Sequence, residues 1–108
     1  MSTTLDRTFI KELMGDDDTL VDRFINIFKH QCPQQLQELI QHHENRDWLS
    51  LSNVAHSMKT QFKYLSLDTL AAQIVEIEIM ADEGDTAGLG LLIQAFEKEF
   101  DQFMQSLG

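Results

Sequence analysis

The stretch WLSLSNVAHSMKTQFKYL, residues 48–65, shows most clearly how this chain folds. Its apolar residues recur every three or four positions, as they do along the buried side of a helix. On a helical wheel, six of them fall within a sector of about 100°: Leu51, Val54, Ala55, Met58, Phe62 and Leu65. The spacing predicts an amphipathic helix that ends at about Tyr64, with Asp47 or Ser50 as its N-cap.

The other side of this helix carries polar residues that can act together. His56, Lys59, Thr60 and Lys63 have the spacing i, i+3, i+4 and i+7, which places them on one solvent-facing side. No Asp or Glu occurs in residues 48–67, so we expect no carboxylate around the imidazole. An exposed neutral imidazole is nucleophilic near pH 7, and nearby ammonium groups stabilise the oxygens of an arriving phosphoryl group. The pattern suits a phosphoryl acceptor but does not by itself distinguish one from a solvated histidine.

The N-terminal part of the chain predicts two more helices. A long one covers about residues 19–44 and contains Pro33, which should kink it. A short amphipathic helix precedes it, with Gly15 as its C-cap and Asp18 as the N-cap of the long helix. The apolar residues of the short helix have four-residue spacing: Leu5, Phe9 and Leu13.

Two further amphipathic helices are predicted after the quoted stretch, at about residues 67–83 and 86–106, separated by Gly84 and Asp85. Four long amphipathic helices joined by short connections must pack antiparallel to bury their apolar stripes. The sequence therefore predicts an all-α fold, an antiparallel up-and-down four-helix bundle with the short N-terminal helix as a lid. We expect a single domain over residues 1–108.

Composition and charge restrict the possible partners. The chain has 108 residues, 43% of them hydrophobic, which suits one core. Its formal net charge is −10, from 18 Asp and Glu against 8 Lys and Arg, and this excess disfavours nucleic acid and anionic membrane surfaces as partners. Residues 1–8 contain no basic, apolar leader, and no stretch approaches about 20 apolar residues. We expect a cytoplasmic monomer without a disulfide, because Cys32 is the single cysteine.

The segment around His56 resembles a known family motif. Ala55-His56-Ser57-Met58-Lys59 is similar to the Ala-His-x-Leu-Lys-Gly signature around the phosphorylated histidine of histidine-containing phosphotransfer (HPt) domains. The resemblance extends over nearly the whole chain, through the features that match the family's loops and helix starts: Gly15-Asp16-Asp17, Phe28, Asp47 and Gly84-Asp85.

The resemblance implies a phosphocarrier rather than an enzyme, with His56 as the phosphorylation site and Lys59 as the residue that steadies the phosphoryl group. The implied partners are receiver domains of response regulators and a hybrid sensor histidine kinase. The chain would need no cofactor of its own, because the receiver supplies Mg²⁺. We place the docking surface on the exposed side of the His56 helix, with Thr60, Gln61 and Lys63 as partner-binding residues.

Two positions depart from the family pattern. Thr60 replaces the usual glycine after the motif lysine, and its larger side chain should affect how closely a partner approaches. Ser66 replaces a second glycine, and we expect it to act as the N-cap of the next helix. The departures leave an alternative open, an HPt-like docking module that binds a kinase or receiver without being phosphorylated.

A di-iron site inside the bundle is a third hypothesis, which the sequence disfavours. Such sites use Glu-x-x-His pairs, and the chain contains none. His42 and His43 are adjacent and so point in different directions. We interpret His43 and Trp48 as covering one end of the core, and Glu78 as a solvated residue that could reach a neighbouring helix.

Overall fold

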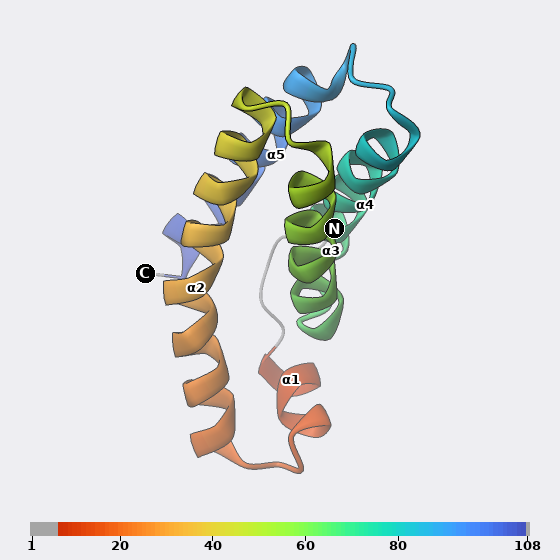
Figure 1. Cartoon of the computed structure of the whole chain (residues 1–108). Helices are drawn as coiled ribbons and strands as arrows, with labels where there is room; N and C mark the ends of the chain where they lie inside the picture. Colours follow the sequence, from red (N-terminus) through yellow and green to blue (C-terminus); the bar gives the residue numbers. More distant parts are fainter. Residues whose placement is uncertain (1–6, 108) are drawn as a thin grey trace.

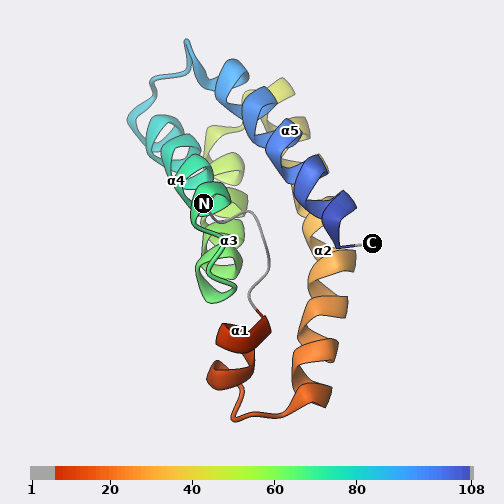
Figure 2. The same cartoon turned by 180° about the vertical axis from the view of Figure 1, so that it is seen from behind.

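The computed structural model describes residues 7–107, which form five helices and no strand. They are α1 (Arg7–Leu13), α2 (Asp18–Glu44), α3 (Trp48–Tyr64), α4 (Asp68–Glu83) and α5 (Leu89–Ser106). The last four run alternately up and down as an antiparallel bundle, and α1 lies beside the N-terminal half of α2, below the turn between α3 and α4 (Figures 1 and 2). The predicted fold class is confirmed.

Phenylalanines from three helices fill the middle of the bundle. The Phe62 ring of α3 lies 6.2 Å from that of Phe28 on α2, and 5.9 and 6.3 Å from those of Phe96 and Phe100 on α5. Pairs of this kind add about 0.5–1.5 kcal/mol each beyond the burial of their area. Five of the six apolar residues predicted to line the core side of α3 are buried, and Val54 is half-buried against them. The packing fixes how α3 is rotated, and with it the direction of the polar side.

Aspartates cap the two helices that matter most for the site. Asp17, not the predicted Asp18, is the N-cap of α2, and its Oδ1 accepts from the backbone N–H of Thr19 at 2.9 Å. Three consecutive aspartates were available, and the sequence alone could not choose among them. Asp47 caps α3 by accepting from Ser50 N–H at 3.2 Å. Hydrogen bonds from the Ser50 side chain and backbone hold the pKa of the Asp47 carboxyl below its usual 3.8.

The turn between α3 and α4 corrects the prediction for Ser66. Ser66 has a left-handed backbone with φ of 58°, and the Leu67 N–H donates to the Phe62 carbonyl at 2.8 Å, as in a Schellman helix end. Leu67 is the N-cap of α4 and makes no side-chain capping bond. Ser66 is therefore the residue that ends α3, a position that favours glycine because glycine lacks a Cβ.

The start of α5 and the buried side of α1 differ from expectation. α5 begins at Leu89 rather than near Thr86, since the chain first has to cross the end of the bundle after Gly84. In α1 the buried residue is Ile10, while Phe9 and Leu13 are 36% and 48% exposed. Ile10 and Met14 are four residues apart, as Phe9 and Leu13 are, so periodicity alone could not select which pair faces the core. Leu5 lies outside the described residues.

Two remaining features of α2 concern Pro33 and Cys32. α2 runs without a break through Pro33, so this proline does not interrupt the helix. Cys32 is fully buried, as expected for a small core residue, and burial raises the pKa of its thiol to about 12. In residues 7–107, no helix is both long and apolar enough to cross a membrane.

Candidate functional site

The site is built on the middle of α3, where buried and exposed residues alternate with helical spacing. Ala55 and Met58 are fully buried on either side of His56 in sequence, whereas the His56 side chain is 64% exposed. The core therefore anchors the backbone of this turn while the imidazole projects into solvent, as the wheel predicted. A rigid backbone and an accessible ring are what a group that reacts with another protein requires.

A carboxylate from the neighbouring helix contacts the imidazole, which corrects the expectation of a carboxylate-free surrounding. Glu78 on α4 places its Oε2 3.1 Å from His56 Nδ1. Because an ionised carboxylate only accepts hydrogen bonds, this contact requires the ring proton on Nδ1. The contact leaves Nε2 as the ring nitrogen that is free to act as a nucleophile.

Lys59 meets the same carboxylate. Its Nζ lies 2.9 Å from Glu78 Oε1, and its side chain is only 20% exposed. His56 and Lys59 are therefore brought together through Glu78, whose own side chain is 14% exposed. A cation and an anion lie beside the imidazole, rather than the two ammonium groups that the wheel indicated.

The other predicted residues continue along the same side of α3. Thr60 is exposed, and its Oγ1 donates to the His56 carbonyl oxygen at 3.2 Å. Gln61 is half-buried, and its Nε2 donates to Gln35 Oε1 of α2 at 2.8 Å. Lys63 is exposed one turn further on and takes no part in these contacts to Glu78.

Gln35 links α2 to the turn that carries the imidazole. It accepts from Gln61 and donates from its Nε2 to Ser57 Oγ at 3.1 Å, next to His56 in sequence. Two polar contacts therefore tie α2 and α3 together beside the exposed histidine. α2 therefore contributes directly to the surroundings of His56.

An apolar surface adjoins these amides along α2 and α3. We call it the α2–α3 apolar surface; it comprises Leu20, Phe24, Ile27 and Tyr64. The rings of Phe24 and Tyr64 stack at a centroid distance of 5.3 Å. Leu20, Ile27 and Tyr64 are 44%, 48% and 44% exposed, and Gln61 lines the same hollow as Phe24 and Ile27. The amino-acid sequence alone does not reveal this surface, because the exposure of these side chains depends on how α2 and α3 pack.

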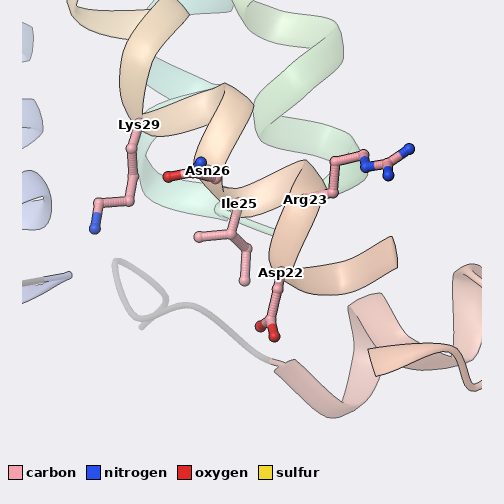
Figure 3. A pocket seen from close by; sticks show the side chains of 5 residues that line it. All are labelled: Asp22, Arg23, Ile25, Asn26 and Lys29. Carbon is pink, nitrogen blue, oxygen red and sulfur yellow. The ribbon is translucent and has the colours of Figure 1, made fainter. Parts of the chain in front are cut away.

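A second hollow lies on another side of α2. It is lined by residues of that helix alone: Asp22, Arg23, Ile25, Asn26 and Lys29. Figure 3 shows that Arg23 extends away from Asp22 and Lys29, so the charged groups do not converge on one point. None of the residues around His56 lines it, and it does not compete with α3 as a reactive site.

His43 fits a structural role. The His43 ring packs 5.9 Å from Trp48, and both residues are half-buried at the end of the bundle where α2 meets α3. In residues 7–107 there is no group of three or more His, Cys, Asp or Glu that could hold a metal ion.

Comparison with known proteins identifies the family. The family model for the Hpt domain matches residues 23–106, which include all four long helices from the second turn of α2 onward. This chain belongs to the Hpt domain family. Among solved structures it is similar to histidine-containing phosphotransfer protein B (HptB) from Pseudomonas aeruginosa PAO1, with a TM-score of 0.83 and 23% sequence identity over 93% of this chain and 87% of that one. At this identity the likeness shows a shared fold, and no curated protein sequence matches.

Family membership gives the chain a coarse function. Hpt domains are phosphocarrier modules of phosphorelays that interact with receiver domains and kinases, and they are not kinases themselves. This Hpt domain therefore has a role in histidine phosphotransfer.

Proposed function

We propose that this Hpt domain accepts a phosphoryl group on Nε2 of His56 from a receiver-domain aspartate, or from a hybrid sensor kinase, and passes it to the receiver of a response regulator. The observation that carries the proposal is the exposed imidazole on a rigid turn of α3, with its Nδ1 already engaged by Glu78. This ring lies within the sequence that resembles the family motif.

The transfer requires an in-line approach of the two proteins. The Nε2 lone pair attacks phosphorus while the bond from phosphorus to the receiver's carboxylate oxygen breaks, and the electron pair leaves with the carboxylate. Mg²⁺ held by the receiver would neutralise negative charge at the leaving group. This chain's part is to hold the imidazole in position and to provide positive charge nearby.

Lys59 is the residue we assign to that charge. Its ammonium group already lies beside the carboxylate that binds the imidazole. A phosphoryl group on Nε2 brings about two negative charges near it, which would compete with Glu78 for the ammonium. Lys59 can therefore stabilise the phosphorylated form without any movement of the helix backbone.

The partner would dock over α3 and the adjoining part of α2. Thr60, Gln61 and Lys63 surround the approach to His56 from the following turns of α3. The α2–α3 apolar surface continues this region with exposed aromatic and aliphatic side chains. Interfaces commonly combine an apolar centre with a polar rim, and this side of the bundle offers both next to the reactive ring.

The test is incubation with a panel of receivers that carry a radiolabelled phosphoryl group. Wild type should acquire a label that is acid-labile and base-stable, as expected for phosphohistidine, and His56→Gln should acquire none. His30→Gln is the matched control, because His30 is another exposed histidine, on α2, and its loss should leave labelling unchanged. Binding without labelling by any receiver would instead support the non-phosphorylated docking module.

A further inference from the structure

Gln35 of α2 uses both ends of its amide to bind two residues of α3. Its Nε2 donates to Ser57 Oγ at 3.1 Å, and its Oε1 accepts from Gln61 Nε2 at 2.8 Å. Gln35 is half-buried, and its sequence neighbour Leu36 is buried in the core, which fixes the rotation of this turn of α2. We call Gln35, Ser57 and Gln61 the amide bridge.

The direction of these hydrogen bonds determines what the amide bridge offers to a partner. Ser57 Oγ accepts from Gln35, so the hydroxyl proton is not used in that bond and can be donated. Gln61 directs its Nε2 toward Gln35, which leaves its Oε1 as an acceptor. Within residues 7–107, neither Ser57 Oγ nor Gln61 Oε1 has a further hydrogen-bond partner. The amide bridge therefore presents one hydroxyl donor and one carbonyl acceptor.

Both groups lie on the part of α3 that a partner would cover. Ser57 is exposed and follows His56 in sequence, and Gln61 stands one turn further along the same side of the helix as Ser57. Gln61 also lines the hollow that Phe24 and Ile27 form on the α2–α3 apolar surface. The amide bridge therefore joins the turn that carries the reactive ring to the apolar surface.

We propose that the amide bridge is a specificity-determining contact for the receiver: Ser57 donates a hydrogen bond to a carbonyl oxygen of the docked receiver, and Gln35 keeps that proton available. A receiver that fits would also present an N–H donor opposite Gln61. A receiver with apolar side chains at these places would leave both groups buried and unpaired, and would bind less tightly. The assignment of this contact rests on the proposed function, and it specifies which receivers that function favours.

Two substitutions remove the donor in different ways. Ser57→Ala deletes the hydroxyl group. Gln35→Glu keeps the shape of the side chain, but an ionised carboxylate only accepts, so it takes the Ser57 proton for itself. Calorimetric titration with the receiver that wild type binds most tightly, chosen from a panel, measures the effect. Each variant should bind that receiver more weakly by roughly threefold to tenfold, as for one lost hydrogen bond.

Two further variants show whether the lost proton is the cause. The double variant should bind no more weakly than Ser57→Ala alone, because the same donor is lost only once. Gln34→Glu is the matched control for charge, since Gln34 is an exposed neighbour of Gln35 on α2. It adds the same charge without meeting the Ser57 hydroxyl, and it should bind as wild type does.

Phosphorylation by potassium phosphoramidate separates docking from chemistry. The phosphorus–nitrogen bond of this donor breaks and ammonia leaves as His56 Nε2 bonds to phosphorus, and no docking surface is used. Ser57→Ala should be phosphorylated at close to the wild-type rate. A merely structural role would slow this reaction as well, because Ser57 belongs to the turn that carries the imidazole.

Four results would overturn the inference: binding of Ser57→Ala as tight as that of wild type, further weakening in the double variant, equal weakening by Gln34→Glu, or slowing of the phosphoramidate reaction that matches the loss of receiver binding. Receivers that bind wild type more tightly than Ser57→Ala but never phosphorylate His56 would refute the proposed function and leave the contact intact. Failure of every receiver to bind would overturn both.

Discussion

Thr60 lies one helical turn from His56, and its side chain is held against that turn. The hydroxyl donates to the His56 carbonyl oxygen, and helical side chains lean toward the N-terminus, so the Thr60 methyl group lies close to the approach to the imidazole. We expect Thr60→Gly to raise the rate of transfer from receivers that wild type uses slowly, by roughly threefold to tenfold, because a partner can then come closer. The rate of transfer is measured with a panel of phosphorylated receivers, in reactions that are quenched at successive times.

Thr60→Ser separates the two parts of the side chain. It keeps the hydroxyl and lacks the methyl group, so it should accelerate transfer as much as the glycine variant if the methyl is the obstacle. Unchanged or slower transfer by both variants would show that Thr60 does not restrict access. Thr60→Gly should lower the free energy of unfolding by about 0.5 kcal/mol, the difference in helix propensity between threonine and glycine.

At the scale of single residues, the sequence predicted the exposed side of α3 but not the chemistry around the ring. The wheel placed His56, Lys59 and Thr60 correctly because their positions depend only on helical spacing. The contact between His56 and Glu78 joins residues 22 positions apart. The contact depends on the position and rotation of α4 relative to α3. Tertiary packing determines these, and local residue spacing does not. From the sequence alone, Glu78 is a solvated residue that can reach a neighbouring helix, and its partner is not defined.

At helix ends, local sequence preferences and tertiary packing can favour different residues. Periodicity located the four long helices well, because each buries a continuous stripe against its neighbours. It failed at the start of α5 and could not choose between Asp17 and Asp18, where the geometry of the connection decides. Ser66 was misassigned because serine commonly caps helices, whereas here the chain needs a left-handed residue to end α3.

We expect Ser66→Gly to stabilise the fold by about 0.5–1 kcal/mol. A left-handed backbone costs a residue with a Cβ roughly 1–2 kcal/mol, and the greater flexibility of unfolded glycine returns part of that gain. The midpoint of urea unfolding should rise without a change in slope. Ser66→Ala is the control and should give no gain, since alanine keeps the Cβ. A lower midpoint for the glycine variant would contradict the assignment of Ser66 as the residue that ends α3.

The Asp47 cap should make the stability of α3 depend on pH. Asp47→Ala should lower the free energy of unfolding at pH 7, because Ser50 N–H loses its acceptor. The pKa of the Asp47 carboxyl is lowered in the folded protein, so its ionised form favours folding above the usual value of 3.8. That contribution is lost as the pH falls through the lowered folded pKa.

The difference between wild type and Asp47→Ala should therefore shrink below about pH 4. Urea unfolding at pH 7 and pH 3 measures it. Asp101→Ala is the comparison, since Asp101 is an exposed aspartate in the interior of α5, away from a helix start, and its effect should not follow this pH dependence. A difference for Asp47→Ala that is as large at pH 3 as at pH 7 would rule out an ionised cap.

Over the whole molecule, charge is distributed unevenly between the two halves of the bundle. Residues 68–106 hold nine of the 18 Asp and Glu but only one of the 8 Lys and Arg, whereas residues 48–67 hold two Lys and no acid. A phosphorylated receiver presents negative charge at its active site, so the α4–α5 side repels it while α3 does not. The field of the bundle therefore favours approach toward His56 over α2 and α3.

Approach of the receiver over α2 and α3 predicts that substitutions of two exposed apolar residues have unequal effects on transfer. Ile27 belongs to the α2–α3 apolar surface and is 48% exposed, whereas Leu91 on the first turn of α5 is 73% exposed. Ile27→Glu should slow transfer from a phosphorylated receiver by roughly tenfold, the effect of losing about 1.4 kcal/mol of docking energy. Phosphorylation of His56 by potassium phosphoramidate should keep the wild-type rate, because this small chemical donor needs no docking surface.

Leu91→Glu introduces the same charge on the other side of the bundle and should leave both reactions at wild-type rates. Comparing the two variants with each donor separates docking from chemistry. Equal slowing of receiver transfer by both would mean that added charge alone weakens the encounter. Slowing by Leu91→Glu alone would indicate that the docking surface lies near the start of α5, away from the residues that adjoin His56.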